Sequence, residues 1–340
     1  MADKLKELMM KIAERTMKMD LDVDGRGVWD WGAGVALYGL MKLFEYNGEK
    51  EIFDYIKDFV DESMQKFDVP KSVNTTAPLC SVLMLYNETR DKKYLNLCEE
   101  FADWLMTDAP RAESGAVEHS GVGVAFDSQV WIDTVFMAGV FLTRVGTITG
   151  NKAYIDEGIK QVVLHMESIQ SENGLFYHGY NYITKNHMSG ALWARGNAWF
   201  TVSVPEIYDF SKVMDKSAID GFVRQVASVR ACQAENGLWH TVMDDSSSYC
   251  EVSAAAGFVY GILLGIRTGL LPEEYRECAV KGAKAVIKKI ADDGTVLDVS
   301  TGTGIQKKRS MYNDMDKSLI MPWGQGLTIM MLIELDILNK

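Results

Sequence analysis

Apolar residues recur at helical spacing along most of the chain, and six apolar segments alternate with six more charged ones. Leu5, Leu8 and Ile12, for example, are three and four positions apart and share one face of a helix. The apolar segments span 33–46, 79–88, 135–149, 198–210, 254–268 and 327–338, and the amphipathic ones 3–18, 51–66, 94–106, 154–169, 218–233 and 275–291. Because alternating Val, Ile and Thr runs are scarce, the pattern predicts an all-α protein.

The apolar segments need cover on both sides, which an inner ring of helices surrounded by an outer ring supplies. Six such pairs predict an (α/α)6 toroid, a six-hairpin barrel in one domain over residues 1–340. An open helical solenoid is the alternative. Closure is favoured because the last apolar segment has no polar capping repeat after it and can pack beside the first.

The charge balance argues against nucleic acid and membranes as partners. The chain has 47 acidic and 35 basic residues and a formal net charge of -12, which repels polyphosphates and anionic lipid. Its longest uncharged runs, 253–266 and 318–333, are too short to span a bilayer. Five widely spaced cysteines and a charged N-terminus without a signal-like apolar core favour the cytoplasm. The sequence specifies no oligomeric state.

Short motifs rich in tryptophan, asparagine and small residues open the apolar segments, and Asn-Gly turns return the chain to the same end. One face of the ring should therefore gather aromatic rings, imidazoles, a carboxylate and a guanidinium, which together suit a sugar site. The residues expected there are Trp29, Trp31, Asn74, His119, Trp131, Asp133, His178, Trp193, Arg195, Asn197, Trp199, His240, Glu251 and Trp323.

Each candidate has a simpler structural interpretation. Asp133 could be a helix N-cap, and Arg195 could be a buried partner of a helix end, although its spacing from Trp199 places both on one helical face. No histidine pair has metal-ligand spacing, and no nucleotide or dinucleotide fingerprint occurs, so neither a metal nor a cofactor is expected. The Ser300–Gly304 stretch predicts only a flexible loop.

Five motifs together resemble one enzyme family. Residues 28–39 (VWDWGAGVALYG), 131–139 (WIDTVFMAG), 174–179 (GLFYHG), 193–199 (WARGNAW) and 249–254 (YCEVSA) are similar, in that order, to the unsaturated rhamnogalacturonyl hydrolases of glycoside hydrolase family 105, relatives of family 88. The resemblance covers about residues 28–335. It implies the (α/α)6 fold and removal of a terminal 4,5-unsaturated uronic acid from oligosaccharides that polysaccharide lyases release.

The resemblance also implies roles for individual residues. Asp133 matches the family's catalytic aspartate, which would protonate C4 of the sugar and then deprotonate the attacking water. Matches to substrate-contacting positions are Trp31, His119, Trp131, His178, Trp193, Arg195, Asn197, Trp199 and Trp323.

Two positions depart from the family pattern. Asn74 stands where the family usually has a second aspartate and is the other candidate catalytic residue, since it could hold the water or hydrogen-bond Asp133. It cannot accept a proton as an aspartate does, and the like charge that would raise the pKa of Asp133 is missing. Ser120 follows His119 where a basic residue is expected, which changes the contacts available to an anionic sugar. Three other classes therefore remain open: a catalytically impaired sugar-binding toroid, a polysaccharide lyase on a related toroid, and a protein-binding helical scaffold.

Overall fold

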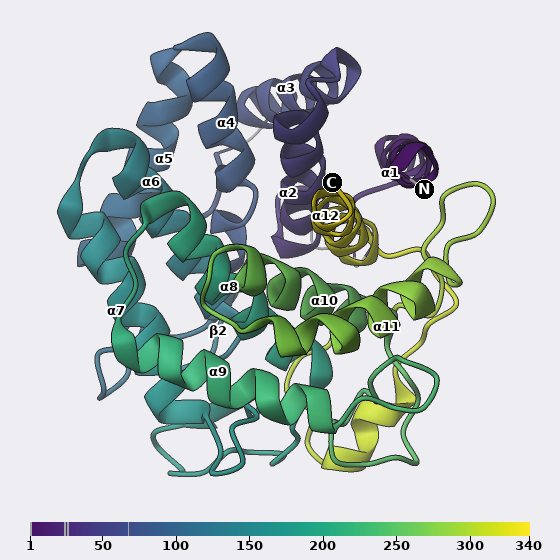
Figure 1. The fold of residues 1–340 in the computed structure, drawn as a ribbon. Helices are drawn as coiled ribbons and strands as arrows, with labels where there is room; N and C mark the ends of the chain where they lie inside the picture. Colours follow the sequence, from purple (N-terminus) through teal and green to yellow (C-terminus); the bar gives the residue numbers. More distant parts are fainter. Residues whose placement is uncertain (1, 24, 26, 67) are drawn as a thin grey trace.

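The computed structural model describes residues 2–23, 25, 27–66 and 68–340, and this part of the chain forms two concentric rings of helices (Figure 1). The inner helices are α2 (Trp31–Asn47), α4 (Leu79–Thr89), α6 (Phe141–Thr149), α8 (Ala194–Ser211), α10 (Val252–Arg267) and α12 (Pro322–Leu338). The outer helices are α1 (Ala2–Met17), α3 (Lys50–Lys66), α5 (Lys92–Thr107), α7 (Lys152–Ile169), α9 (Lys216–Ala231) and α11 (Arg276–Ile287). The predicted all-α (α/α)6 toroid is confirmed.

Burial separates the two rings as the apolar pattern predicted. Helix α10 is buried at every position from Val252 to Gly265, because neighbours cover it on all sides. Helix α3 buries only Ile52, Ile56, Val60 and Ser63, which lie on one face at intervals of three and four residues. The remaining face of α3 carries charged side chains and meets solvent.

The inner ring closes where α12 packs against α2, which excludes the open solenoid. The two helices approach so closely that a Cβ on Gly39 would lie 2.5 Å from the Gly326 backbone. A Cβ on Gly326 would in turn lie 2.2 Å from the carbonyl oxygen of Val35. Glycine at both positions therefore permits the backbone contact that joins the last inner helix to the first.

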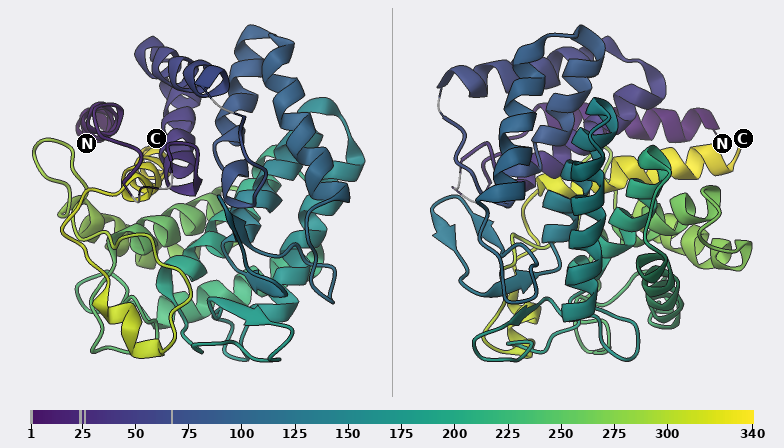
Figure 2. Two further views of the ribbon diagram at one scale, coloured as in Figure 1. Left: turned by 180° about the vertical axis from the view of Figure 1, so that it is seen from behind. Right: turned by 90° about the vertical axis from the view of Figure 1, so that its left-hand side faces the viewer.

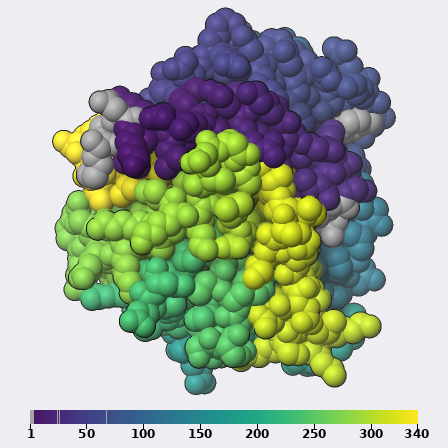
Figure 3. Space-filling model, turned by 90° about the vertical axis from the view of Figure 1, so that its right-hand side faces the viewer, coloured from purple at the N-terminus to yellow at the C-terminus, as the bar shows by residue number. Residues whose placement is uncertain are grey.

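The first outer helix completes the sixth pair by packing on α12. Arg15 of α1 donates to Thr295 Oγ1 over 3.0 Å, in the loop that follows α11. Gln325 of α12 donates to the carbonyl oxygen of Gly294 in the same loop, also over 3.0 Å. Figure 2 shows the N-terminal and C-terminal helices side by side, and Figure 3 shows the purple N-terminal segment against the light-green and yellow C-terminal segments on the surface.

Departures from helical pairing are short and lie mostly between the helices. The inner segment predicted at 135–149 begins as a π-helix, η2 (Val135–Val140), and continues as α6. The 3₁₀-helices are η1 (Asn74–Thr76), η3 (Glu273–Tyr275) and η4 (Arg309–Asp314). The described part of the chain also contains two antiparallel strand pairs, β1 (Ser120–Gly121) with β2 (Val124–Ala125), and β3 (Gln129–Trp131) with β4 (Gly179–Asn181).

None of the helices in the described ranges combines the length and apolarity needed to cross a bilayer. The apolar inner helices instead face one another and the outer ring.

Candidate active site

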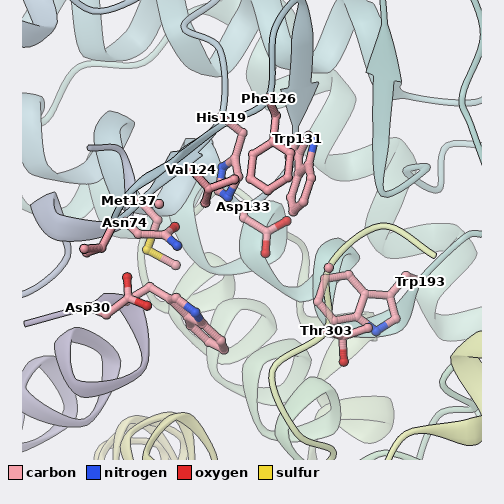
Figure 4. A pocket seen from close by; sticks show the side chains of 14 residues that line it. Asp30, Asn74, His119, Val124, Phe126, Trp131, Asp133, Met137, Trp193 and Thr303 are labelled. Carbon is pink, nitrogen blue, oxygen red and sulfur yellow. The ribbon is translucent and has the colours of Figure 1, made fainter. Parts of the chain in front are cut away.

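A cavity of about 390 Å³ lies at the end of the toroid where the inner helices begin. That volume falls within the range of small-molecule sites, about 300–1,000 Å³. Its lining comes from segments far apart in sequence: Asp30, Trp31, Asn74, His119, Gly121, Val122, Val124, Phe126, Trp131, Asp133, Met137, Trp193, Thr303 and Gly304. Figure 4 shows the Asp133 carboxyl pointing into the space between Asn74 and Trp193.

The pairing of β3 with β4 positions Asp133 against His178. Trp131 lies opposite Gly179 in this pair, and the amide of Ile132 donates to the carbonyl oxygen of His178 over 3.0 Å. A Cβ on Gly179 would lie 2.7 Å from the carbonyl oxygen of Val130, so glycine allows the strands to meet here. The strand pairing therefore brings Asp133, which follows Trp131 by two residues, next to His178, which directly precedes Gly179.

The Asp133 carboxyl has two nitrogen neighbours and one open side. Trp199 Nε1 donates to Oδ1 over 3.1 Å, and His178 Nε2 lies 3.4 Å from Oδ2. The side chain keeps 14% of its surface exposed, toward the cavity. This geometry argues against the N-cap interpretation, because the carboxyl faces the cavity and two side chains from other elements.

Electrostatics favour an ionised Asp133 and a neutral His178 at neutral pH. Burial opposes ionisation of Asp133, but the polar contact with the His178 ring, together with His119 and the Asp133 amide, holds the pKa of this carboxyl below its ordinary value. Burial also lowers the pKa of His178, and the nearby Arg195 charge acts in the same direction against the pull of Asp133. The carboxyl therefore resembles a base more than an acid in the empty site.

Asn74 faces the same cavity from the turn before α4. Its segment is held in place by neighbours, since the amide of Val73 donates to Ser120 Oγ over 3.0 Å. Thr76 Oγ1 lies 2.8 Å from the carbonyl oxygen of Met137, so the hydroxyl binds η2, where a π-helical turn interrupts the regular backbone ladder. The bond from Thr76 to Met137 thus joins the turn that carries Asn74 to the segment that follows Asp133. The bond from Val73 to Ser120 fixes the Asn74 turn from the other side.

Aromatic rings form two walls of the cavity. His119 and Trp131 stack with ring centroids 4.4 Å apart and planes at 10°, and Phe126 lies 4.3 Å from Trp131. On the other side, Trp31 stacks on Trp323 at 4.3 Å. Only Trp31 of this second pair lines the cavity, since Trp323 is completely buried behind it.

Arg195 lies behind the wall and organises the loop that forms it. Its guanidinium donates to Ser300 Oγ over 2.7 Å, to the Thr301 carbonyl over 2.9 Å and to Thr303 Oγ1 over 3.1 Å. Glu251 accepts from the Ser300 amide over 3.0 Å and fixes the same segment. The expectation that Ser300–Gly304 is merely a flexible loop is wrong, because these bonds pin it and Thr303 and Gly304 line the cavity.

Five candidate contact residues are absent from the cavity surface. Arg195, Asn197, Trp199 and Trp323 have no exposed surface, and His178 retains 1%. Asn197 bonds the amide and carbonyl of Phe176, each at 2.8 Å, and therefore ties the return loop to α8. The structure thus differs from the expectation of direct substrate contact at these positions, because the protein's own atoms surround the side chains.

The candidates that do line the cavity are Trp31, Asn74, His119, Trp131, Asp133 and Trp193. Sequence reasoning missed Asp30 and the apolar hairpin residues Val122, Val124 and Phe126. Asp30 belongs to the 28–39 motif, so the sequence could have indicated its place beside Trp31. The hairpin carried little signal, because its two strands have only two residues each.

Within the described ranges, no group of three or more His, Cys, Asp or Glu side chains is arranged to hold a metal ion. The polar side-chain groups of the lining residues are one amide, one imidazole, two carboxylates, one threonine hydroxyl and the indole nitrogens of three tryptophans. Such a set can exchange protons with a bound molecule and hydrogen bond to its hydroxyl groups.

Comparisons with known proteins agree with this geometry. The chain is 32% identical over 338 residues to the unsaturated rhamnogalacturonyl hydrolase YesR of Bacillus subtilis, covering 98% of this chain and 95% of the relative. It is 23% identical over 320 residues to an unsaturated 3S-rhamnoglycuronyl hydrolase of an Alteromonas species, covering 89% and 76% of the two chains. The crystal structure of a possible GH105 member from Salmonella enterica superimposes with a TM-score of 0.95 at 30% identity, over 100% of this chain and 95% of the other.

The model of Glycosyl Hydrolase Family 88 matches residues 1–338, nearly the whole length of the sequence. The match spans every segment that contributes to the cavity, from Asp30 to Gly304. The chain therefore belongs to Glycosyl Hydrolase Family 88 and is a glycosidase.

Proposed function

We propose that the protein removes the terminal 4,5-unsaturated uronic acid from lyase-generated oligosaccharides by hydrating the C4=C5 double bond, with Asp133 as the catalytic residue. The observation that carries this proposal is a carboxyl group open to an aromatic-walled cavity of about 390 Å³, in a chain 32% identical to an unsaturated rhamnogalacturonyl hydrolase along almost its entire length.

The substrate's vinyl ether defines the steps. Protonated Asp133 transfers its proton to C4, and positive charge develops on C5 and the ring oxygen. Water then adds to C5 while the Asp133 carboxylate takes its proton, which restores the acid. The resulting hemiketal opens to a ketone at C5, the freed C1 hemiacetal collapses to an aldehyde, and the aglycone leaves with its oxygen. Because no bond to C1 is attacked directly, carboxylate spacing does not predict a retaining or inverting outcome.

The bound substrate adds a further negative charge to the cavity that Asp133 lines. A carboxyl whose pKa is below normal is a poor acid at neutral pH, and Asn74 contributes no like charge. The uronate's own carboxylate, held in the same partly buried cavity, raises the pKa of Asp133 by repulsion. Substrate binding therefore helps to load Asp133 with the proton that it transfers.

The two aromatic walls suit the two sides of a sugar ring. We assign stacking on the unsaturated uronyl ring to Trp31, Trp131 and Trp193, and hydrogen bonding to His119 and Asn74, because these side chains line the cavity. Arg195, Asn197, His178, Trp199 and Trp323 then act from behind the wall by positioning these residues and Asp133. The half-exposed Val122 and Val124 form an apolar edge, which favours a rhamnogalacturonyl-type aglycone over a sulfated one.

The site draws on segments from Asp30 to Gly304, so we propose that the ring over residues 1–340 works as one catalytic unit. Five unpaired cysteines, of which Cys80, Cys98 and Cys278 are buried, suit a reducing cytoplasm. The net charge of -12 disfavours nucleic acid as a further partner.

The test follows the ultraviolet absorbance of the unsaturated uronyl group during incubation with products of a rhamnogalacturonan lyase. Loss of absorbance together with release of the aglycone supports the proposed hydrolase. New absorbance from intact polymer would instead identify a lyase. An unchanged signal, with sugar binding retained, would identify a catalytically impaired binding toroid.

A further inference from the structure

Tyr312 reaches the catalytic centre through His178. Its hydroxyl oxygen lies 2.6 Å from His178 Nδ1, and the other ring nitrogen of His178 lies 3.4 Å from Asp133 Oδ2. Tyr312 belongs to η4, 134 residues from His178 along the chain, and both side chains are almost fully buried. The three residues therefore form a continuous line from η4 to the cavity.

The hydrogen bonds around Tyr312 determine which way its proton points. The amide of Gln306 donates to the hydroxyl oxygen over 3.4 Å, and Ser189 Oγ lies at 3.4 Å. His178 Nδ1, at 2.6 Å, is by far the nearest acceptor for the single phenolic proton. A hydroxyl that accepts from Gln306 and donates to Nδ1 requires that Nδ1 carry no proton.

The opposite tautomer of His178 is disfavoured from the other side. With its proton on Nδ1, a neutral imidazole would turn the lone pair of Nε2 toward the Asp133 carboxylate, and two acceptors would face each other at 3.4 Å. Neither of these two atoms has a hydrogen-bond partner among the described residues, so their 3.4 Å contact is the polar interaction that the tautomer decides. Only the Nε2–H tautomer places a donor, and not a second lone pair, beside the carboxylate while Nδ1 accepts from Tyr312.

We propose that Tyr312 is a positioning residue that fixes His178 as the Nε2–H tautomer, so that His178 directs a donor at Asp133. This inference rests on the proposed role of Asp133, but it concerns a proton position that can be measured without turnover. The charged and titratable groups that face the pair are His119 from the segment before β1, Arg195 from α8 and Asp30 from the start of α2.

The direct test is long-range ¹H–¹⁵N correlation of the imidazole rings at pH 7, with His178 assigned by its loss in the His178→Gln variant. The chain has five histidines, so the spectrum is tractable. The proposal predicts the Nε2–H pattern in the unmodified protein and a mixed or Nδ1–H pattern in Tyr312→Phe. An Nδ1–H pattern in the unmodified protein, or an unchanged pattern in Tyr312→Phe, overturns it.

A kinetic readout separates positioning from a loss of packing. Removing the Tyr312 hydroxyl lets the His178 proton leave Nε2, so the ionised Asp133 carboxyl loses a donor and its pKa rises. The alkaline limb of kcat/KM should therefore move to higher pH by about one unit. A lower rate at every pH with an unmoved limb would contradict the proposal. The matched control is Tyr94→Phe, which removes a 2.8 Å bond to Asp61 on the outer ring and should leave the limb in place. The tautomer result holds even if Asp133 proves not to be the acid.

Discussion

The indole nitrogen of Trp199 donates a hydrogen bond to Asp133 Oδ1 over 3.1 Å, and this bond joins inner helix α8 to the turn before η2. Trp199 is completely buried, so the bond orients the carboxyl without presenting the indole to a ligand. His178 flanks the other oxygen at 3.4 Å. Trp199 and His178 thus hold the Asp133 carboxyl from two sides, and the exposed part of this carboxyl faces the cavity.

Replacing Asp133 by Asn should abolish turnover and leave sugar binding largely intact. The amide keeps the size of the carboxyl but cannot transfer a proton to C4, and general acid catalysis contributes about 10²–10⁴-fold. Single-turnover rates and calorimetric titration with an unsaturated disaccharide check the two halves of the prediction. Wild-type turnover in this variant would remove Asp133 from the mechanism.

The pH profiles of kcat/KM and kcat should differ in a defined direction. The low pKa of Asp133 in the empty site places the alkaline limb of kcat/KM, which reports the free enzyme, at acidic pH. The substrate carboxylate raises the pKa of Asp133 in the complex, so the alkaline limb of kcat should lie at higher pH. Steady-state kinetics across pH 4–8 measures both limbs, and coincident limbs would contradict the substrate-assisted loading of Asp133.

Asn74→Asp should shift the kcat/KM limb toward neutral pH and raise activity more at pH 7 than in acid. The new carboxylate faces the cavity that Asp133 lines and repels its ionised form. It also repels the anionic substrate, so KM should rise. Asn74→Ser, which adds no charge, is the control. Superimposable profiles for the unmodified chain and Asn74→Asp would show that this position has no electrostatic effect on Asp133.

Arg195→Lys should raise KM at least tenfold with a smaller effect on kcat, because lysine keeps the charge but loses the planar fork that holds Ser300, Thr301 and Thr303. Limited proteolysis should then cut the loop at 300–304 faster. Arg267→Lys is a matched control, since Arg267 holds Glu334 through two 2.9 Å bonds outside the cavity lining. A variant with unchanged KM and unchanged cleavage would show that the loop is held by other contacts.

Stability should fall as the pH drops below about 6.5, partly through His165. Burial lowers the pKa of His165 from 6.5 to about 4, so between these values the unfolded chain binds the proton and the folded chain does not. The free energy of unfolding that is lost by keeping His165 unprotonated in the folded chain is negligible above pH 6.5. This loss grows on acidification and reaches about 2 kcal/mol at pH 5. Denaturant unfolding at pH 7 and pH 5 should show a smaller difference for His165→Gln than for the half-buried control His187→Gln. Equal differences would contradict this assignment.

The helices were predictable because their signals are local. The apolar spacing within 198–210 and 254–268 reports burial directly, and the ends of α8 and α10 differ from the predicted ones by no more than four residues. The ring's closure at Gly39 and Gly326 was implied by the repeat, although no local signal revealed the 2.5 Å approach.

The site was less predictable because its chemistry depends on contacts between distant segments. Arg195 looked like a ligand contact in its own motif, and only its bonds to residues 105 to 108 positions later show that it acts behind the wall. Tyr312 lies in a charged segment without a recognisable motif, so its bond to His178 had no counterpart in the sequence. The place of Asp133 at the cavity was predictable because its motif lies directly before an apolar helix.

Whether hydration of the C4=C5 bond precedes cleavage is decided by two time courses in one reaction of an unsaturated uronyl disaccharide. Ultraviolet absorbance follows the C4=C5 bond, and chromatography follows the released aglycone. If hydration at C5 initiates cleavage, the absorbance should fall no later than the aglycone appears, and both signals should stop in Asp133→Asn. Release of the aglycone while the absorbance persists would mean direct attack on the glycosidic bond and would contradict hydration at C5.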